Sequence, residues 1–403
     1  MKVPIKRFQK GAFVYLSGNK PPKEFYIIKD GKIKLKRTNQ LLGKSEETRS
    51  IGYIFGVIQC ITGIVEDESA FAITDVDVFV ISKDKIRDLF INHKKVILKI
   101  LAEYSEILRK LDADLINYNF FPNITDRKNT IFDIIEKYMN IEEEAKASHL
   151  LYHLLEEYPD DNEVKNKSKL LIPDFKKPLI LDASDKLIYE ITLPANSVVF
   201  TEFELANTFF IIKYGKVKIT KLREDREILL AILGESDIFG EMAILNDKPR
   251  NATACTEEDT SLMVISKSGV DRLPPPIFVK LLEFLSKRIW LVQQQLIAYK
   301  LPSIVSKLYY ILTSKIRQVI QNPEEAQDSP FLFRFPLKEL CNMIDYEYKE
   351  YNKSEISDFL NDKNLDFYQD SIKVKKIGQL LDKNAYYISR YLASMNIKQD
   401  KIL

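Results

Sequence analysis

The segment from Phe239 to Thr253 brings together residue types suited to holding a sugar phosphate. Gly240 has no Cβ, so backbone N–H groups there can approach an anion closely. The residues after it predict a short helical turn, whose first N–H groups and dipole also favour an anion. Arg250 supplies a planar, permanently charged fork for phosphate oxygens. Glu241 repels phosphate but can accept hydrogen bonds from sugar hydroxyls, so the segment indicates a ribose-phosphate site.

This segment resembles the phosphate-binding cassette of the cyclic-nucleotide-binding domain family, which includes protein kinase A regulatory subunits and bacterial cAMP receptor proteins. The family pattern of F-G-E-hydrophobic-A, a variable stretch and P-R-x-A-T is matched at 239–243 and 249–253. By this resemblance Glu241 binds the ribose 2′-hydroxyl and Arg250 binds the cyclic phosphate. The implied ligand-binding residues are Gly240, Glu241, Met242, Ala243, Arg250, Asn251, Ala252 and Thr253.

The nucleotide base is less well defined by these residues. In kinase members of the family, Thr after the arginine favours guanine and Ala favours adenine, whereas this chain has Asn251. The bacterial order of domains favours cAMP over cGMP.

Short β-type runs flank the segment and predict the scaffold that holds it. Residues 209–219 have the composition of two strands joined at Gly215, and 228–233 and 261–265 predict further strands. Many short strands separated by turn residues favour a small β-barrel or jelly roll.

A helix is predicted after these strands, over residues 277–299, where apolar residues recur at helical spacing. The prolines at 274–276 suit a helix start. In the family, a helix at this place closes over the base or pairs two subunits, which implies a lid and a contact with a homodimer or protein partner. Trp290 could cap the base, but packing in the core is the favoured interpretation.

The strand pattern occurs twice in the chain. Residues 25–35 match 209–219, residues 54–56 match 238–240, and residues 80–83 match 264–267, always 184 positions apart. A constant separation over three blocks predicts a second copy of the barrel near the N-terminus.

The first copy lacks the residues that are predicted to bind a sugar phosphate in the second copy. In the shared register Val57 replaces Glu241, Glu66 replaces Arg250, and Asp67 and Glu68 replace Asn251 and Ala252. Carboxylates in place of an arginine would repel a phosphate. We therefore expect that the first barrel does not bind a cyclic nucleotide.

The composition is that of a globular protein with several domains. The 403 residues exceed one compact domain, and the net charge of +2 gives no general attraction to nucleic acid or anionic lipid. No apolar run approaches the roughly 20 residues of a membrane span, and no signal peptide is expected. We predict a cytoplasmic protein with no membrane segment and with three reduced cysteines, Cys60, Cys255 and Cys341.

No catalytic or metal-binding constellation is expected. His149 and His153 lie four apart on a predicted helix and could face one way, with Glu156 and Glu157 nearby. However, no glutamate stands between them as in the H-E-x-x-H motif. We therefore expect partly exposed helix residues, no metal, no cofactor and no enzymatic activity.

The last hundred residues resemble the winged helix-turn-helix that follows the barrel in bacterial cAMP receptor proteins. The resemblance places a first helix at 335–344, a recognition helix at 348–361 and a wing at 364–374. Residues 301–403 contain 15 Lys and Arg against 14 Asp and Glu, so this region lacks the basic character typical of nucleic-acid binding. The candidates for DNA contacts are Lys349, Asn352, Lys353, Lys373 and Lys375.

Together these patterns predict an α+β chain with two jelly-roll β-barrels of the cyclic-nucleotide-binding type. The expected domains are a degenerate barrel at 1–95, a helical linker at 96–178, a ligand-binding barrel with its lid helix at 179–300, and a winged-helix-like domain at 301–403. The resemblance implies an allosteric cyclic nucleotide receptor that regulates transcription. The alternatives are a nucleotide-responsive scaffold protein that does not bind DNA and a structural protein that binds no nucleotide.

Overall fold

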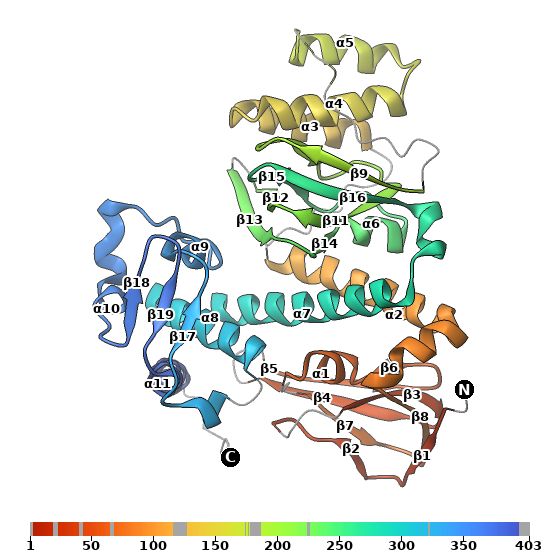
Figure 1. Cartoon of the computed structure of the whole chain (residues 1–403), viewed down its shortest axis with the longest axis vertical. Coiled ribbons are helices and arrows are strands. Elements are labelled where there is room, and N and C mark those ends of the chain that lie inside the picture. The colour runs from red at the N-terminus through yellow and green to blue at the C-terminus, as the bar shows by residue number, and fades with distance from the viewer. Residues whose placement is uncertain are drawn as a thin grey trace. The chain divides into compact units, whose positions relative to one another are not determined.

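The computed structural model describes residues 3–18, 23–39, 43–64, 68–115, 127–173, 175, 177, 187–223, 226–320 and 323–394. The chain divides into two compact units, one formed by Met1–Ile100 with Phe278–Leu403 and the other by Leu101–Ile277. Each unit contains one β-barrel (Figure 1). The long helices α2 (Ile86–Leu115) and α7 (Pro275–Lys300) each contribute residues to both units.

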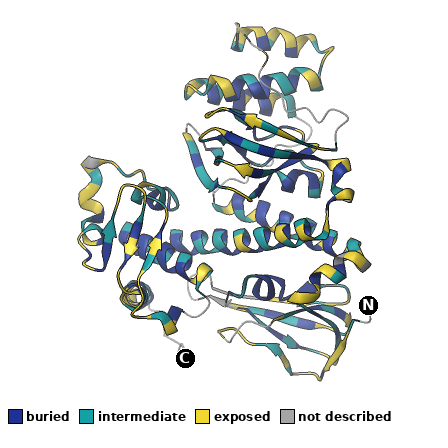
Figure 2. Cartoon of the chain, in the orientation of Figure 1, coloured by how far each residue is buried: buried dark blue, intermediate teal, exposed yellow. Residues whose placement is uncertain are grey.

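The first barrel consists of two four-stranded antiparallel sheets, with the strand orders β1-β8-β3-β6 and β2-β7-β4-β5. Buried and exposed residues are interspersed along the strands, and in β7 every second residue is buried (Figure 2). The elements are β1 (Ile5–Phe8), β2 (Phe13–Tyr15), β3 (Glu24–Asp30), β4 (Ile33–Asn39), β5 (Gly43–Arg49), β6 (Ile54–Phe55), α1 (Val57–Thr62), β7 (Glu68–Ala72), β8 (Val76–Ser82) and η1 (Lys83–Lys85).

The second barrel repeats this topology, with the strand orders β9-β16-β11-β14 and β10-β15-β12-β13. Its elements are β9 (Ile188–Leu193), β10 (Val198–Phe200), β11 (Thr208–Tyr214), β12 (Val217–Arg223), β13 (Arg226–Leu233), β14 (Ile238–Phe239), α6 (Glu241–Asn246), β15 (Thr253–Thr256), β16 (Thr260–Ser266) and η3 (Lys267–Arg272).

The repeat predicted from the sequence is confirmed by these bounds. Strands β3, β4, β6 and β8 and helix α1 begin and end 184 positions before β11, β12, β14, β16 and α6. The strand register is also shared, since Phe25 pairs with Ile81 as Phe209 pairs with Ile265.

Three helices precede the second barrel: α3 (Arg127–Asn140), α4 (Glu144–Glu157) and α5 (Asn162–Leu171). They share a small hydrophobic core, which includes Ile135, Tyr138 and Leu150, with Leu222 of β12. All three helices lie within the helical linker predicted at 96–178. Glu142 has a φ of +62°, so the chain turns before α4 can start.

The C-terminal region packs helices against a three-stranded sheet of order β17-β19-β18. Its core includes Tyr309, Leu312 and Phe359. The elements are α8 (Ile304–Val319), η4 (Pro323–Ala326), β17 (Phe331–Phe333), α9 (Leu337–Asn342), η5 (Glu350–Ile356), α10 (Ser357–Leu360), β18 (Leu365–Phe367), β19 (Ile372–Val374) and α11 (Ile377–Ser394).

The recognition helix predicted at 348–361 does not form as one α-helix. Residues 350–356 form a 3₁₀ helix, and α10 covers only four residues. The Asn352 side chain accepts a hydrogen bond from Lys349 N and donates one to Glu347 O. Such local side-chain bonds to the backbone compete with α-helical pairing, which accounts for the shorter helix.

Candidate functional site

Arg250 lies at the centre of the predicted site, just before β15. Its Nη1 donates to Gly240 O at 2.6 Å, and its Nη2 donates to Thr208 O at 2.8 Å. The guanidinium lies over the Phe200 ring, 4.0 Å from its centroid, and 5.6 Å from that of Phe210. Two neutral carbonyls and two aromatic faces thus hold this charged group in place.

The backbone conformation and the close packing at position 240 require a glycine. Its φ of +79° is a left-handed conformation that L side chains rarely adopt. A Cβ added there would lie 2.6 Å from Arg250 Nη1 and 3.2 Å from Phe200 Cε1. The absence of a side chain therefore leaves the space that the guanidinium fills.

The site buries one arginine together with two glutamates. Arg250 is 4% exposed, and burial lowers its pKa to about 10, so it keeps its charge at neutral pH. Its Nε makes no hydrogen bond within the described part of the chain. The carboxylates of Glu204 and Glu241 are also buried and act in the opposite direction on the pKa of Arg250. Burial raises the pKa of Glu204 to about 7, against the opposing effect of Arg250.

The C-terminal half of α2 contacts the predicted cassette directly. Ser105 Oγ donates to Met242 O at 3.2 Å. Arg109 Nη1 donates to Pro249 O at 3.0 Å, and Arg109 is itself only 7% exposed. The helix therefore contacts both α6 and the loop that leads from α6 to Arg250.

Two further side chains complete this contact between α2 and the cassette. Lys248 Nζ lies 2.8 Å from Glu106 Oε2, and Asn251 Nδ2 donates to Asp112 Oδ2 at 3.1 Å. The Asn251 side chain, which follows Arg250 in the sequence, is thus engaged by α2.

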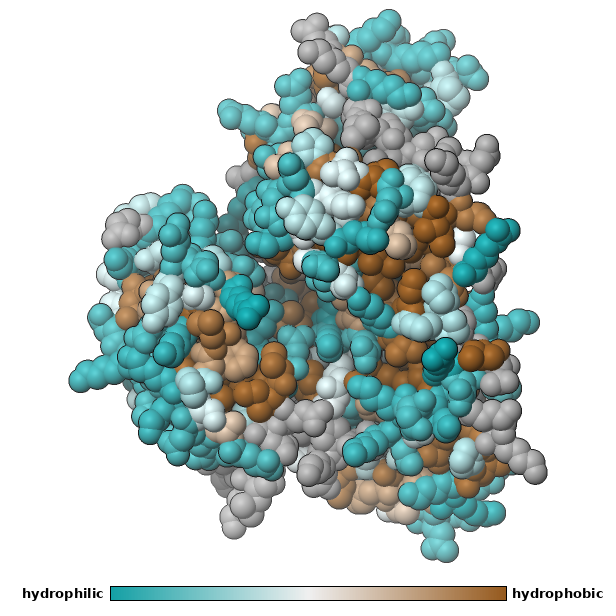
Figure 3. All heavy atoms as spheres, viewed as in Figure 1, coloured by the Kyte–Doolittle hydropathy of each residue, from teal (hydrophilic) through white to brown (hydrophobic). Residues whose placement is uncertain are grey.

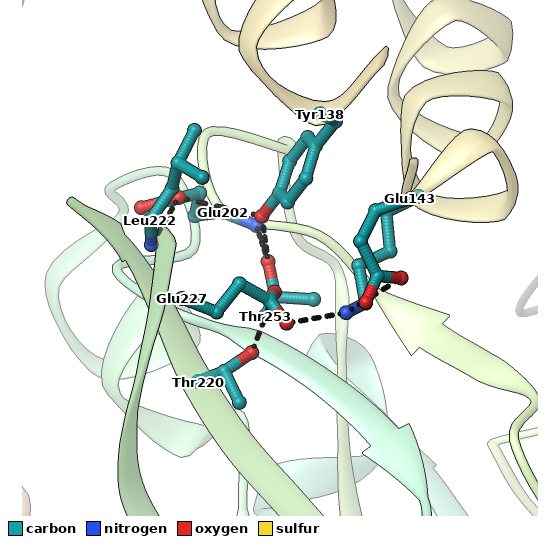
Figure 4. Close-up of polar contacts among 8 residues, drawn as sticks. Tyr138, Glu143, Glu202, Thr220, Leu222, Glu227 and Thr253 are labelled. Atoms are coloured by element: carbon teal, nitrogen blue, oxygen red, sulfur yellow. Dashed lines mark hydrogen bonds and ion pairs between the residues drawn. The ribbon is translucent and has the colours of Figure 1, made fainter. Parts of the chain in front are cut away.

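Thr253 belongs to a buried polar network that joins the cassette to α3 (Figure 4). Its Oγ1 lies 2.8 Å from Tyr138 Oη and accepts a hydrogen bond from Glu202 N. Glu202 in turn accepts from Leu222 N on β12. The Thr253 side chain therefore positions β15 against the preceding helices.

The first barrel keeps the backbone of this site and changes its side chains. Gly56 has a φ of +76° and precedes α1, as Gly240 precedes α6. The side-chain atoms nearest to a Cβ on Gly56 would belong to Tyr15 and Tyr26, at 3.5 and 3.6 Å. Aromatic rings therefore lie beside this glycine, where the second barrel has its arginine.

Two further replacements in the first barrel can be compared with the sequence-based expectation. Val57 is buried in the place of Glu241, and Glu68 accepts hydrogen bonds from Tyr15 and Arg37. Val65, Glu66 and Asp67 lie outside the described residues. That this barrel binds no nucleotide remains a prediction.

The sequence predicted a ligand-binding segment but not the residues that surround it. All eight predicted ligand-binding residues lie on one continuous segment, from Gly240 after β14 to Thr253 at the start of β15. Thr208, Phe200 and Arg109, which hold Arg250 or the loop, were missed because they are far away in the sequence.

The predicted DNA contacts are largely engaged by protein groups. Lys349 pairs with Glu347 at 2.7 Å, and Lys375 pairs with Asp366 at 2.8 Å. The Asn352 side-chain amide forms hydrogen bonds with the backbone of Lys349 and Glu347. The side chains of Lys353 and Lys373 are exposed. Hydrophilic side chains cover much of the face of this region seen in Figure 3.

Two remaining expectations concern cysteines and membranes. The structure contains the three cysteines as free thiols, and burial raises the pKa of Cys60, Cys255 and Cys341 to about 12. Within the ranges that the structure describes, no helix combines the length and apolar character needed to cross a bilayer.

Comparison with known proteins supports the two barrels as domains of one family. The family model "Cyclic nucleotide-binding domain" matches the chain twice, at residues 5–93 and 190–274. Both matches coincide with the two barrels, and the second contains the whole cassette.

Curated relatives of two kinds match part of the chain. A cAMP-dependent protein kinase regulatory subunit from Yarrowia lipolytica is 33% identical over 25% of this chain and 26% of its own length. A CRP-like cAMP-activated global transcriptional regulator from Mycobacterium tuberculosis is 34% identical over 28% of this chain and 52% of its own length. The match thus spans about half or less of these relatives.

A solved structure matches a longer part of the chain. The catabolite activator protein of Thermus thermophilus is 21% identical, with a TM-score of 0.27, over 50% of this chain and 91% of that chain.

Proposed function

We propose, from the premise that this chain belongs to the cyclic nucleotide-binding domain family, that its second barrel is a receptor for a cyclic mononucleotide. The observation that carries this proposal is Arg250. A guanidinium that is 4% exposed, held by Gly240 O and Thr208 O and left with an unpartnered Nε, is placed for an anion. A cyclic phosphate supplies that anion, and Glu241 beside it suits a ribose hydroxyl.

The ligand we propose is cAMP. Both kinds of curated relative carry cAMP in their names, and the bacterial order of domains favours the same ligand. Asn251 gives no preference between bases, because its amide is engaged by Asp112.

Only one site per chain is proposed to be competent. The first barrel has Val57 in the place of Glu241, and Tyr15 and Tyr26 beside Gly56. Neither tyrosine carries a positive charge for phosphate, so an anion placed there would lack its counter-charge.

The proposed receptor is allosteric, and α2 is its first responding element. Three side chains of α2 contact the loop that contains Arg250 and a fourth contacts α6, so a shift of the cassette on ligand binding would alter these contacts. Such coupling requires that the ligand bind one arrangement of the loop more tightly than the other.

The output we propose is regulation of transcription through the C-terminal region, residues 301–403. The order of α8, β17, α9, η5 with α10, β18 and β19 is compatible with a winged helix. The ion pairs of Lys349 and Lys375 favour the alternative, a scaffold that contacts proteins and does not bind DNA.

Two measurements test this function. Calorimetry with cAMP and cGMP is expected to give micromolar or tighter binding of cAMP, and absence of binding by both would favour a structural protein. Titration of promoter fragments at several salt concentrations then separates the outputs. A DNA-binding regulator shows an affinity that falls steeply with salt, whereas a scaffold protein shows no affinity above background.

A further inference from the structure

A cluster of metal-ligating side chains lies beside the second barrel, in the unit that contains α4. His149 and His153 on α4 face Glu204 in the loop between β10 and β11, and donor atoms of all three lie within 4.8 Å of one another. We propose that these residues form a binding site for a divalent transition metal ion, with Zn²⁺ as the preferred ion.

The spacing of the donor atoms fits such an ion. Glu204 Oε2 lies 3.5 Å from His149 Nδ1, and Glu204 Oε1 lies 3.5 Å from His153 Nε2. Zinc bonds of about 2.0–2.1 Å in tetrahedral geometry separate neighbouring ligand atoms by about 3.3 Å. Small side-chain movements would therefore bring the three ligands into place.

The buried imidazole of His149 has ring nitrogens that a ligand could engage. Its side chain is 2% exposed, yet neither of its ring nitrogens makes a hydrogen bond within the described residues. A buried polar group without a partner is costly. A metal ion at this position would satisfy one of the two nitrogens.

The surrounding structure holds these ligands in position. Thr201 N donates to Glu204 Oε2 at 3.0 Å, which orients the carboxylate as metal ligands generally require. Lys146, one turn before His149, anchors α4 to the barrel through Glu227 on β13 at 2.5 Å. The ligands thus stand on a fixed helix and a fixed loop.

The donor set selects the class of metal. Two imidazoles and one carboxylate suit Zn²⁺ and its neighbours, whereas Mg²⁺ and Ca²⁺ prefer oxygen ligands throughout. A cavity of about 200 Å³ adjoins the cluster and can supply water as a further ligand. Arg250 also lines this cavity and opposes a cation, while Glu156 at its edge adds a favourable charge.

A consequence for nucleotide binding follows, and it rests on the proposed function. Glu204 and Arg250 line the same cavity, where the carboxylate offsets the charge of the guanidinium. A metal ion bound to Glu204 would neutralise that carboxylate and add positive charge near the phosphate. Metal and cyclic nucleotide should therefore each increase the affinity of the other, because such coupling is reciprocal.

The metal site is tested with the full-length chain, free of any affinity tag and treated with a chelator. Titration with Co²⁺, followed by its visible absorption, and with Zn²⁺ by calorimetry should each give one ion per chain. His153→Ala removes a ligand that is partly exposed and should weaken Zn²⁺ binding at least tenfold, on the order of the loss from outer-shell changes. His93→Ala, at the remaining histidine of the chain, is the control and should bind as the wild type does.

Glu204→Gln is a second variant that removes a proposed metal ligand. Circular dichroism checks that each variant is folded. Failure of the wild type to bind one ion, or equal binding by wild type and both ligand variants, would overturn the metal site. Zn²⁺ should also lower the dissociation constant of cAMP at least about fivefold relative to chelator. Metal binding in a protein that shows no cAMP affinity would leave the metal site standing and refute the proposed function alone.

Discussion

Replacement of Gly240 by alanine isolates the contact on which the proposed site depends. The new Cβ would lie 2.6 Å from Arg250 Nη1, so the guanidinium must move away from Gly240 O. A hydrogen bond to a charged group contributes about 1.5–3 kcal/mol. If the displaced arginine loses one such bond to the phosphate, the dissociation constant of cAMP rises about ten- to hundredfold.

The first barrel provides a matched control for this substitution. Gly56 has nearly the same φ, +76° against +79°, and occupies the equivalent position in the repeat. A Cβ on Gly56 meets its nearest neighbours at 3.5 and 3.6 Å, which is ordinary contact. Gly56→Ala therefore carries the same backbone strain, about 1–2 kcal/mol, without displacing an arginine.

Calorimetric titration with cAMP compares the two variants with the wild type. Circular dichroism and thermal unfolding establish that both variants are folded. We expect weak binding by Gly240→Ala and wild-type affinity for Gly56→Ala. Wild-type affinity in Gly240→Ala, or an equal loss in both variants, would refute the reasoning from the position of Arg250.

Two further predictions concern stability. Arg109→Ala removes the charged donor to Pro249 O, which should lower the melting temperature of the second barrel by about 3–12 °C in calorimetry, whereas exposed Lys110→Ala should change it little. Burial raises the pKa of the Glu202 carboxyl group from 4.5 to about 7. At a pH between these two values, the unfolded chain has released a proton that the folded chain keeps. The free energy of unfolding should therefore fall by about 3 kcal/mol as the pH rises from 4.5 to 7. Glu202→Gln should lack this part of the pH dependence, and an unchanged pH profile in this variant would contradict the assignment to Glu202.

The tandem barrels could be predicted because their information is local or periodic. Strand alternation, turn glycines such as Gly31 and Gly215, and the constant separation of 184 positions all lie in short blocks of sequence. The cassette was predictable for the same reason, since Gly240 and Arg250 are ten positions apart. Their shared segment is continuous, so no tertiary contact was needed to recognise it.

The surroundings of the cassette depend on contacts between distant segments. Arg109 and Asp112 contact residues about 140 positions further along the chain, and no pattern in α2 marks them as partners of a loop. The histidine pair illustrates the same limit. Glu204 joins His149 and His153 only after β10 and α4 have packed together, so the sequence predicted no metal site.

The C-terminal region shows how local chemistry can override a family pattern. The resemblance implied one helix over 348–361, but Asn352 forms hydrogen bonds with the backbone of Lys349 and Glu347, and residues 350–356 form a 3₁₀ helix. The exposed charges of Lys349 and Lys375 are then paired within the protein.

The number of cAMP molecules bound per chain tests the central claim most directly. Equilibrium dialysis of the full-length protein is expected to give one site per chain, and Arg250→Gln is expected to abolish it while exposed Arg272→Gln retains it. Loss of the paired N–H donors of Arg250 corresponds to a change of about a hundredfold or more in the dissociation constant. Two sites per chain, or one site that persists in folded Arg250→Gln, would contradict the assignment of the ligand to the second barrel.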